Sequence, residues 1–214
     1  MLRRASIGCG VLLAAAALEA GAGDEVGVKT EVSKPIVYYA TDTPLSQFGC
    51  ELVDIENRYY LKWEPVFDTD LEHIRVIWNS WELEATGLNN IKKYKKVEET
   101  EFQTELEDTK YKITEYLIFS VSVLPKTKAF YEESAKEYWR FRLIGEDGDI
   151  EYVGVRDQAD FTIWNWHMGS VFLYTNTYYV YFRNPFKQEP PRYLRLIVEG
   201  GKYRHGFEWR FKEK

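Results

Sequence analysis

Cysteine is nearly absent from this chain: of its 214 residues, only Cys9 and Cys50 are cysteines. Cys9 lies in a segment that we expect to be removed, so the mature chain has no intrachain disulfide and is stabilised by packing. An exported protein without disulfides is more typical of a bacterial envelope than of an animal extracellular space. No histidine lies near Cys50 in sequence to activate it, so we interpret this residue as small and buried.

Long apolar runs are absent after residue 22. The one apolar run, Ile7–Leu18, is too short to span a bilayer comfortably. It follows the basic pair Arg3-Arg4 and precedes Ala20-Gly21-Ala22, which is the pattern of a secretory signal peptide cleaved after Ala22. We therefore expect residues 1–22 to be a signal peptide and the mature chain to be periplasmic, on the cell surface or secreted, without stable membrane insertion. The alternative is a retained N-terminal anchor.

An excess of positive charge is also absent. The whole chain has a net charge of −6, and without residues 1–22 it keeps 26 basic and 33 acidic residues, a net charge of −7. This balance argues against nucleic acid or an anionic membrane as the partner. Charged residues are densest in residues 85–110. Four lysines there (Lys92, Lys93, Lys95 and Lys96) precede five glutamates (Glu98, Glu99, Glu101, Glu105 and Glu107). We interpret this stretch as a solvated hairpin or loop, with a docking surface for a charged partner as the alternative.

Recognisable catalytic and metal-binding patterns are lacking. The three histidines, His73, His167 and His205, show no spacing typical of metal ligands, so we expect no metal and no cofactor. His73 stands at the start of an expected strand and His205 beside Gly206 in an expected turn, so both are predicted to be surface residues. No Gly-x-Ser-x-Gly motif occurs, and no pair of carboxylates is singled out by its spacing. We therefore expect no enzyme activity.

Aromatic residues, in contrast, are abundant, with 16 Tyr, 7 Trp and 12 Phe. Apolar and polar residues alternate from Arg58 to Trp78 around a turn at Asp68–Asp70, as in two antiparallel strands. Asp147-Gly148 and Gly200-Gly201 are typical of tight turns. The pattern shows no long amphipathic helix, only a short helical turn at 129–136. It predicts an all-β fold, an antiparallel β-sandwich. The expected strands are 51–55, 58–64, 73–83, 111–124, 138–143, 150–155, 161–166, 171–174, 178–182, 193–198 and 207–211, with a short edge strand at 36–40.

Residues 48–156 resemble a fibronectin type III module. Leu61–Pro65 resembles its second strand, Leu124–Thr127 its Leu-x-Pro-x-Thr corner, and Tyr138–Leu143 the strand that carries its tyrosine. The resemblance implies that Trp63 fills the space between two sheets and that Tyr138 anchors the crossing loop. Ten residues, 128–137, separate Thr127 from Tyr138, where the family has almost none.

On this division, residues 23–47 form a leader before the fibronectin-like module. Residues 157–214 supply additional C-terminal strands, which either form a second subdomain or complete the first sandwich. An immunoglobulin-like sandwich of this kind is usually a binding or spacing element.

The most distinctive local pattern is Trp164-Asn165-Trp166-His167, where two indoles share one face of an expected strand. If that face is open, the indoles form a stacking platform for sugars or for apolar side chains; if it is closed, they are core. Tyr179 and Tyr181 alternate with a second aromatic row, so one face of their strand is expected to meet another layer or another protein. Trp164, Trp166, His167, Tyr179 and Tyr181 are the candidate binding residues.

Together these patterns predict an exported, non-enzymatic β-sandwich protein of the bacterial cell envelope that contacts a protein or a glycan. A carbohydrate-binding or carbohydrate-cleaving protein with an aromatic platform is one alternative. A structural spacer in an envelope assembly is the other. The sequence leaves the oligomeric state open.

Overall fold

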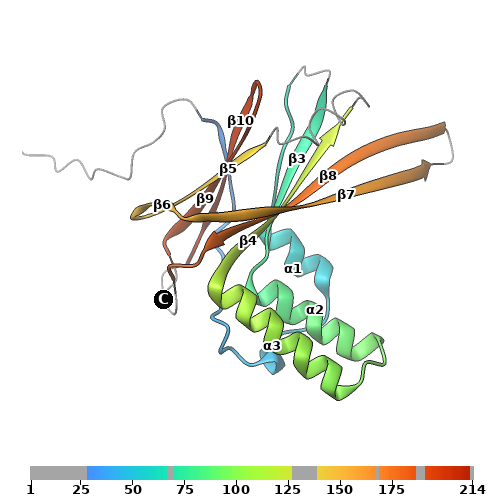
Figure 1. The fold of residues 1–214 in the computed structure, drawn as a ribbon, viewed down its shortest axis with the longest axis vertical. Coiled ribbons are helices and arrows are strands. Elements are labelled where there is room, and N and C mark those ends of the chain that lie inside the picture. The colour runs from blue at the N-terminus through green and yellow to red at the C-terminus, as the bar shows by residue number, and fades with distance from the viewer. Residues whose placement is uncertain (1–27, 67–69, 127–138, 167–168, 187–190, 213–214) are drawn as a thin grey trace, which may run out of the picture.

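The computed structural model describes residues 28–66, 70–126, 139–166, 169–186 and 191–212, and its strands form two sheets (Figure 1). The first sheet has the strand order β1-β10-β9-β5-β6. β1 is parallel to β10, and the other neighbours are antiparallel. The strands of this sheet are β1 (Thr30–Val32), β5 (Arg140–Gly145), β6 (Gly148–Ile150), β9 (Tyr193–Gly200) and β10 (Tyr203–Arg210).

The second sheet is antiparallel throughout, with the order β2-β3-β4-β8-β7. Its strands are β2 (Tyr60–Trp63), β3 (Leu71–Trp78), β4 (Tyr116–Pro125), β7 (Tyr152–Trp166) and β8 (Gly169–Arg183). β8 pairs with β4, and β9 pairs with β5. The strands after residue 157 therefore lie in the same two sheets as the strands before it.

One apolar core lies between the two sheets, so the predicted β-sandwich is confirmed. Alternate residues of β4, β8, β9 and β10 enter this core, as the pleat of a β-strand requires. The rings of Phe119 in β4 and Trp209 in β10 meet across it with centroids 5.2 Å apart. The indole nitrogen of Trp209 donates a hydrogen bond to the carbonyl oxygen of Tyr59 at 2.9 Å, so the buried N–H is satisfied.

Three α-helices lie together at one end of the sandwich (Figure 1), namely α1 (Leu52–Tyr59), α2 (Trp81–Tyr94) and α3 (Glu99–Glu115). The prediction that the chain has no long helix is therefore wrong, and so are the strand predicted at 51–55 and the loop at 85–110. In the described part of the chain, none of the helices is both long and apolar enough to cross a membrane.

The second helix has both a start signal and an apolar stripe. Ser80 caps it by accepting a hydrogen bond from the backbone N–H of Leu83 at 3.3 Å. Trp81, Ala85 and Leu88, spaced by four and three residues, are buried against the third helix. This spacing places them on one side of a helix. A stripe so narrow is easily missed among many charged residues, because the other side of the helix is solvated.

The third helix also turns one stripe of side chains inward, at the helical spacing of Phe102, Leu106, Thr109 and Ile113. It continues to Glu115, so the strand predicted over 111–124 begins only at Tyr116, as β4. Before the helices, a 3₁₀-helix, η1 (Leu45–Gln47), belongs to the segment predicted as a leader. The side-chain amide of Asn89 in α2 holds this segment by donating hydrogen bonds to the carbonyl oxygens of Leu45 and Phe48, both at 2.9 Å.

β7 and β8 are longer than predicted. Each has 15 residues, in place of the four shorter strands expected over 150–182. β8 pairs with β4 only from Asn176 to Arg183, and its earlier residues pair with β7 alone. The two strands therefore extend together beyond the rest of the sheet (Figure 1). Of the predicted turns, Gly148 and Gly201 occur between paired strands with φ angles of 110° and 54°, which glycine adopts without strain.

Two predictions about histidine are wrong, because His73 and His205 are both buried. His205 lies inside β10 between the exposed Arg204 and the buried Gly206, and it is not in a turn. Gly206 beside it is required by a close approach of β1, since a Cβ there would lie 2.6 Å from Oγ1 of Thr30. His73 follows an irregularity in the pairing of β3 with β4, which interrupts the simple alternation.

Trp63 lies where the resemblance placed it, between the sheets, but its ring is only partly buried. It belongs to β2, an edge strand of four residues, and it packs against Tyr203 and His205 of the opposite sheet. The predicted signal peptide (1–22), the helical turn at 129–136, Tyr138 and the turn residues Asp68 and Thr69 lie outside the described residues.

Candidate binding surface

The two faces of β8 differ in their surroundings. Tyr178, Val180 and Phe182 are buried in the core between the sheets. Tyr179 and Tyr181 alternate with them, so they lie on the opposite, outer face of the sheet, where both are half-buried. The sequence predicted that this strand is aromatic on both faces and that one face meets another layer or another protein. The structure identifies Tyr179 and Tyr181 as the face that the core does not use.

The register of the strands shows what surrounds these two tyrosines. Tyr179 pairs with Ser120 of β4 on one side and with Arg156 of β7 on the other. The row continues from Ser120 through Ile77 of β3 to Tyr60 of β2. Residues paired in this way share one face of the sheet. We call this outer surface the tyrosine face; it comprises Tyr60, Ile77, Tyr116, Ser120, Ser122, Thr177, Tyr179 and Tyr181.

Aromatic contacts fix part of the tyrosine face. Tyr181 and Tyr116 meet edge to face with ring centroids 6.0 Å apart. The guanidinium group of Arg183 lies over the Tyr116 ring at 5.4 Å from its centroid. Gly154 of β7 pairs with Tyr181, and a Cβ at Gly154 would meet no atom within 4 Å. The surface beside Tyr181 is therefore open on its β7 side.

Hydroxyl groups lie beside the tyrosines. The side chains of Ser122 and Thr177 share a hydrogen bond of 3.1 Å across β4 and β8. Ser120 donates a hydrogen bond to the side-chain oxygen of Asn79 at 2.9 Å, and the amide of Asn79 donates to Glu84 at 3.0 Å. Hydroxyl groups both donate and accept hydrogen bonds, so each retains capacity for a polar ligand. Tyrosine rings supply rigid apolar area with a polar tip.

The other predicted site residues lie farther along the same hairpin. Trp164 pairs with Val171 and Trp166 with Gly169, near the end of the β7–β8 hairpin. These two tryptophans therefore lie in the part of the hairpin that extends beyond β4, where the described structure pairs β7 and β8 only with each other. Their side chains and the whole of His167 lie outside the described part of the structure.

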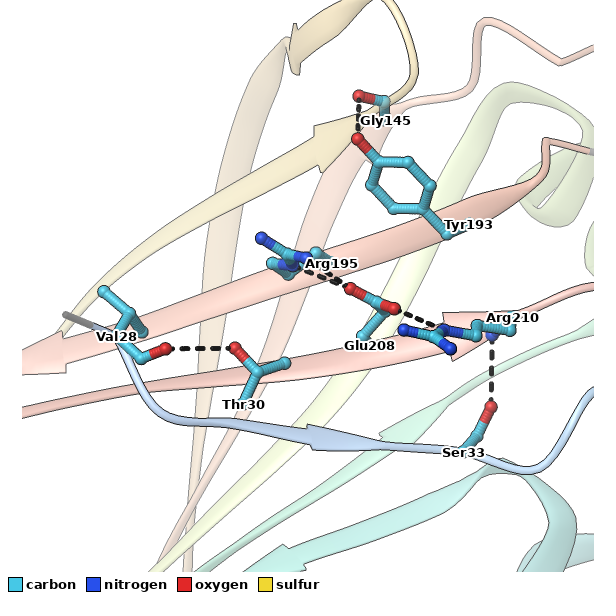
Figure 2. A network of polar contacts seen from close by, with 8 residues as sticks. All are labelled: Val28, Thr30, Ser33, Gly145, Tyr193, Arg195, Glu208 and Arg210. Carbon is cyan, nitrogen blue, oxygen red and sulfur yellow. Dashed lines mark hydrogen bonds and ion pairs between the residues drawn. The ribbon is translucent and has the colours of Figure 1, made fainter. Parts of the chain in front are cut away.

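The first sheet carries a different outer surface, a network centred on Glu208 (Figure 2). Arg195 donates to one carboxylate oxygen of Glu208 at 2.8 Å, and Arg210 donates to the other at 2.7 Å. The side chain of Glu208 is 4% exposed, whereas that of Arg210 is 58% exposed. The backbone N–H of Arg210 donates to Ser33 at 3.1 Å. The network joins β9, β10 and the segment after β1, so we assign it a structural role.

Other reactive groups are sparse in the part of the chain that the structure describes. No three residues among its histidines, cysteines and carboxylates are close enough together to hold a metal ion. The prediction that Cys50 is buried is wrong: it is half-exposed, and the ammonium group of Lys93 lies 3.3 Å from its sulfur. It lines a shallow surface hollow with Phe48, Asn89 and Lys92.

Comparison of the chain with known protein families, with curated proteins and with solved structures finds no match. What the chain can bind is therefore inferred from its own surfaces. Sequence reasoning found Tyr179 and Tyr181 but missed Tyr116, Ser120 and Tyr60. Their alternation with the apolar residues Leu117, Phe119 and Leu61 was visible in the sequence, but only strand pairing shows that they share one surface.

Proposed function

We propose that this chain is an exported, non-catalytic β-sandwich protein of the bacterial envelope that binds glycan through the tyrosine face. The observation that carries the proposal is the division of β8, whose core face is closed while Tyr179 and Tyr181 remain half-exposed beside Ser120, Ser122 and Thr177. Export is supported by the N-terminal pattern of a basic pair, an apolar run and small residues.

The composition of the face suits a sugar more than an apolar partner. A sugar ring offers C–H groups for stacking and hydroxyls that both donate and accept hydrogen bonds. Tyr179 and Tyr181 supply the stacking surface, and the Ser122–Thr177 pair lies in the adjacent row of the sheet. Arg156 adds a donor beside Tyr179. Such a surface binds by contact, without a charged pair placed for acid–base catalysis.

A panel of soluble glycans tests this function. Isothermal titration with cello- and chito-oligosaccharides and with soluble peptidoglycan fragments is expected to show saturable binding of at least one class. The double variant Tyr179→Ala, Tyr181→Ala is expected to weaken this binding at least about tenfold, the effect of losing one good stacking contact. Tyr111→Ala is the matched control, because Tyr111 is exposed on α3, outside the tyrosine face.

Two results would contradict the proposal. One is the absence of binding to every glycan of the panel by the folded wild-type protein. The other is glycan binding that the double variant retains at full strength. N-terminal sequencing of protein secreted by a bacterial host tests export separately, with Gly23 expected as the first residue.

A further inference from the structure

The described structure leaves one long sheet edge without a partner strand. The outermost strands β1, β2 and β6 have three, four and three residues, whereas β7 has 15. Short edge strands are a common protection against unwanted pairing, and a long edge is a template for another strand. β7 is thus the one edge in the described structure that is long enough to hold a second chain by backbone hydrogen bonds.

The described side chains at the start of β7 are open to solvent. Val153 is 43% exposed and Val155 is 42% exposed, although both are large apolar residues. A Cβ at Gly154 would meet no atom within 4 Å, so the face of the sheet is also open at this position. Among the described strands, β7 pairs with β8 alone. Neighbouring apolar residues that stay exposed on a strand edge are typical of an interaction surface.

We infer that two copies of this chain pair antiparallel through their β7 strands, with Gln158 of one copy opposite Gln158 of the other. A twofold axis then passes through Gln158, and each residue of β7 faces the residue equally far on the other side of position 158. The two five-stranded sheets would become one continuous sheet. This inference is independent of the glycan-binding proposal.

The sequence of β7 is self-complementary in this register. Arg156 stands opposite Asp160 of the second copy, and by symmetry Asp160 stands opposite Arg156. Val155 stands at the register position opposite Phe161, which pairs an apolar residue type with another. Gly154 stands opposite Thr162. Opposite charges and apolar pairs at directly facing positions are the pairs that stabilise an antiparallel ladder.

Neighbouring registers lack this complementarity. Centring the pair on Asp157 or on Asp160 places two aspartates opposite each other at the axis, and centring it on Arg156 does the same with two arginines. Centring it on Ala159 places Asp157 opposite Phe161. Like charges directly opposite each other destabilise a sheet, and burying a charge against an aromatic ring without a partner is costly. Of the five registers centred on residues 156 to 160, only the one through Gln158 avoids both conflicts.

Charge variants test the pairing. By sedimentation velocity, the wild type is expected to show a monomer–dimer equilibrium. Arg156→Asp places two aspartates opposite each other at two symmetric positions, and we expect it to weaken the dimer about tenfold or more. Asp160→Arg should weaken it in the same way. The double variant Arg156→Asp, Asp160→Arg exchanges the two charges and is expected to restore dimerisation, a recovery that general damage to the strand would not produce.

Cysteine cross-linking tests the register. In a chain with Cys9→Ser and Cys50→Ser, mild oxidation of Gln158→Cys is expected to give a disulfide-linked dimer, because the two positions meet at the axis. Thr162→Cys is the control, since its two copies would be about 27 Å apart along the strands. Mixing Gly154→Cys with Thr162→Cys should give a mixed dimer. A monomer at all concentrations, a dimer indifferent to the charge variants, or efficient cross-linking through Thr162 alone would overturn the inference.

Discussion

Trp63 and His205 form a parallel stack, with ring centroids 4.5 Å apart and an angle of 15° between the ring planes. The two residues come from opposite sheets, Trp63 from the edge strand β2 and His205 from β10. The stack therefore closes one side of the sandwich, with an aromatic ring that is partly exposed covering an imidazole that is 2% exposed. The contact is therefore expected to contribute to the stability of the fold, and the burial of His205 to its dependence on pH.

Replacing Trp63 with Ala is expected to lower the free energy of unfolding by about 2 kcal/mol. This loss is smaller than the 3–5 kcal/mol typical of a fully buried tryptophan, because the ring is only partly buried. Trp63→Phe keeps an aromatic ring over His205 and should lose less than half as much. Urea denaturation checks both variants, and a loss below about 0.5 kcal/mol for Trp63→Ala would show that the stack contributes little.

Stability is expected to fall as the pH is lowered from about 6.5 to about 4. Burial lowers the pKa of His205 to about 4, with a smaller effect from Lys29, and burial lowers the pKa of His73 to about 4, helped by Lys62 and Arg75. In this pH range the unfolded chain binds more protons than the folded chain, so acid favours unfolding. The contribution of the two buried neutral histidines to the free energy of unfolding is fully present above pH 6.5, and each accounts for up to about 3 kcal/mol of it.

His205→Gln provides the check on this pH dependence. Its side chain cannot become cationic, so the slope of unfolding free energy against pH should decrease by the share of one histidine. In the described structure Nε2 of His205 makes no hydrogen bond, and Glu31 lies 3.5 Å away, so the variant loses no hydrogen bond at Nε2. It does lose the ring stacked on Trp63, which lowers the free energy of unfolding at every pH and leaves the slope as the quantity to compare. An unchanged slope in this variant would mean that His205 does not titrate as its burial implies.

Substitutions on the two faces of β8 are expected to destabilise the protein by different amounts. Tyr178→Ala removes a buried ring from the core and should cost about 3 kcal/mol or more in stability. Tyr179→Ala removes a half-exposed ring from the tyrosine face and should cost about 1 kcal/mol or less. Thermal unfolding of the two single variants measures the difference. Equal losses at these adjacent positions would show that the outer face is also covered.

Glu208→Ala is expected to destabilise the protein by about 3 kcal/mol, because it removes a buried carboxylate that pairs with both Arg195 and Arg210. Glu199→Ala is the matched control: Glu199 pairs with Arg204 at 3.4 Å, but both side chains are about half-exposed, so its loss should be below about 0.5 kcal/mol. Chemical denaturation of both variants compares their free energies of unfolding. Similar small losses would show that the network of Figure 2 contributes little to stability.

The helices show what local reasoning could have predicted. Phe102, Leu106 and Ile113 have helical spacing, and Ser80 stands before an apolar residue as an N-cap does. These signals were present but weak, because one apolar stripe among many charges is also compatible with a solvated hairpin. The helices are stabilised by packing on each other at Trp81 and Leu88, a long-range contact that sequence spacing does not show.

By itself the sequence determined the strand periodicity, the turns at Gly148 and Gly201, and the alternation of Tyr179 and Tyr181 with a second aromatic row. Only the tertiary structure decided which row enters the core, that His205 lies inside a strand, and that β7 remains an edge. The physical reason is that a period of two residues defines two faces but does not say what covers either. Coverage and pairing depend on strands far apart in the chain, which meet only in the folded protein.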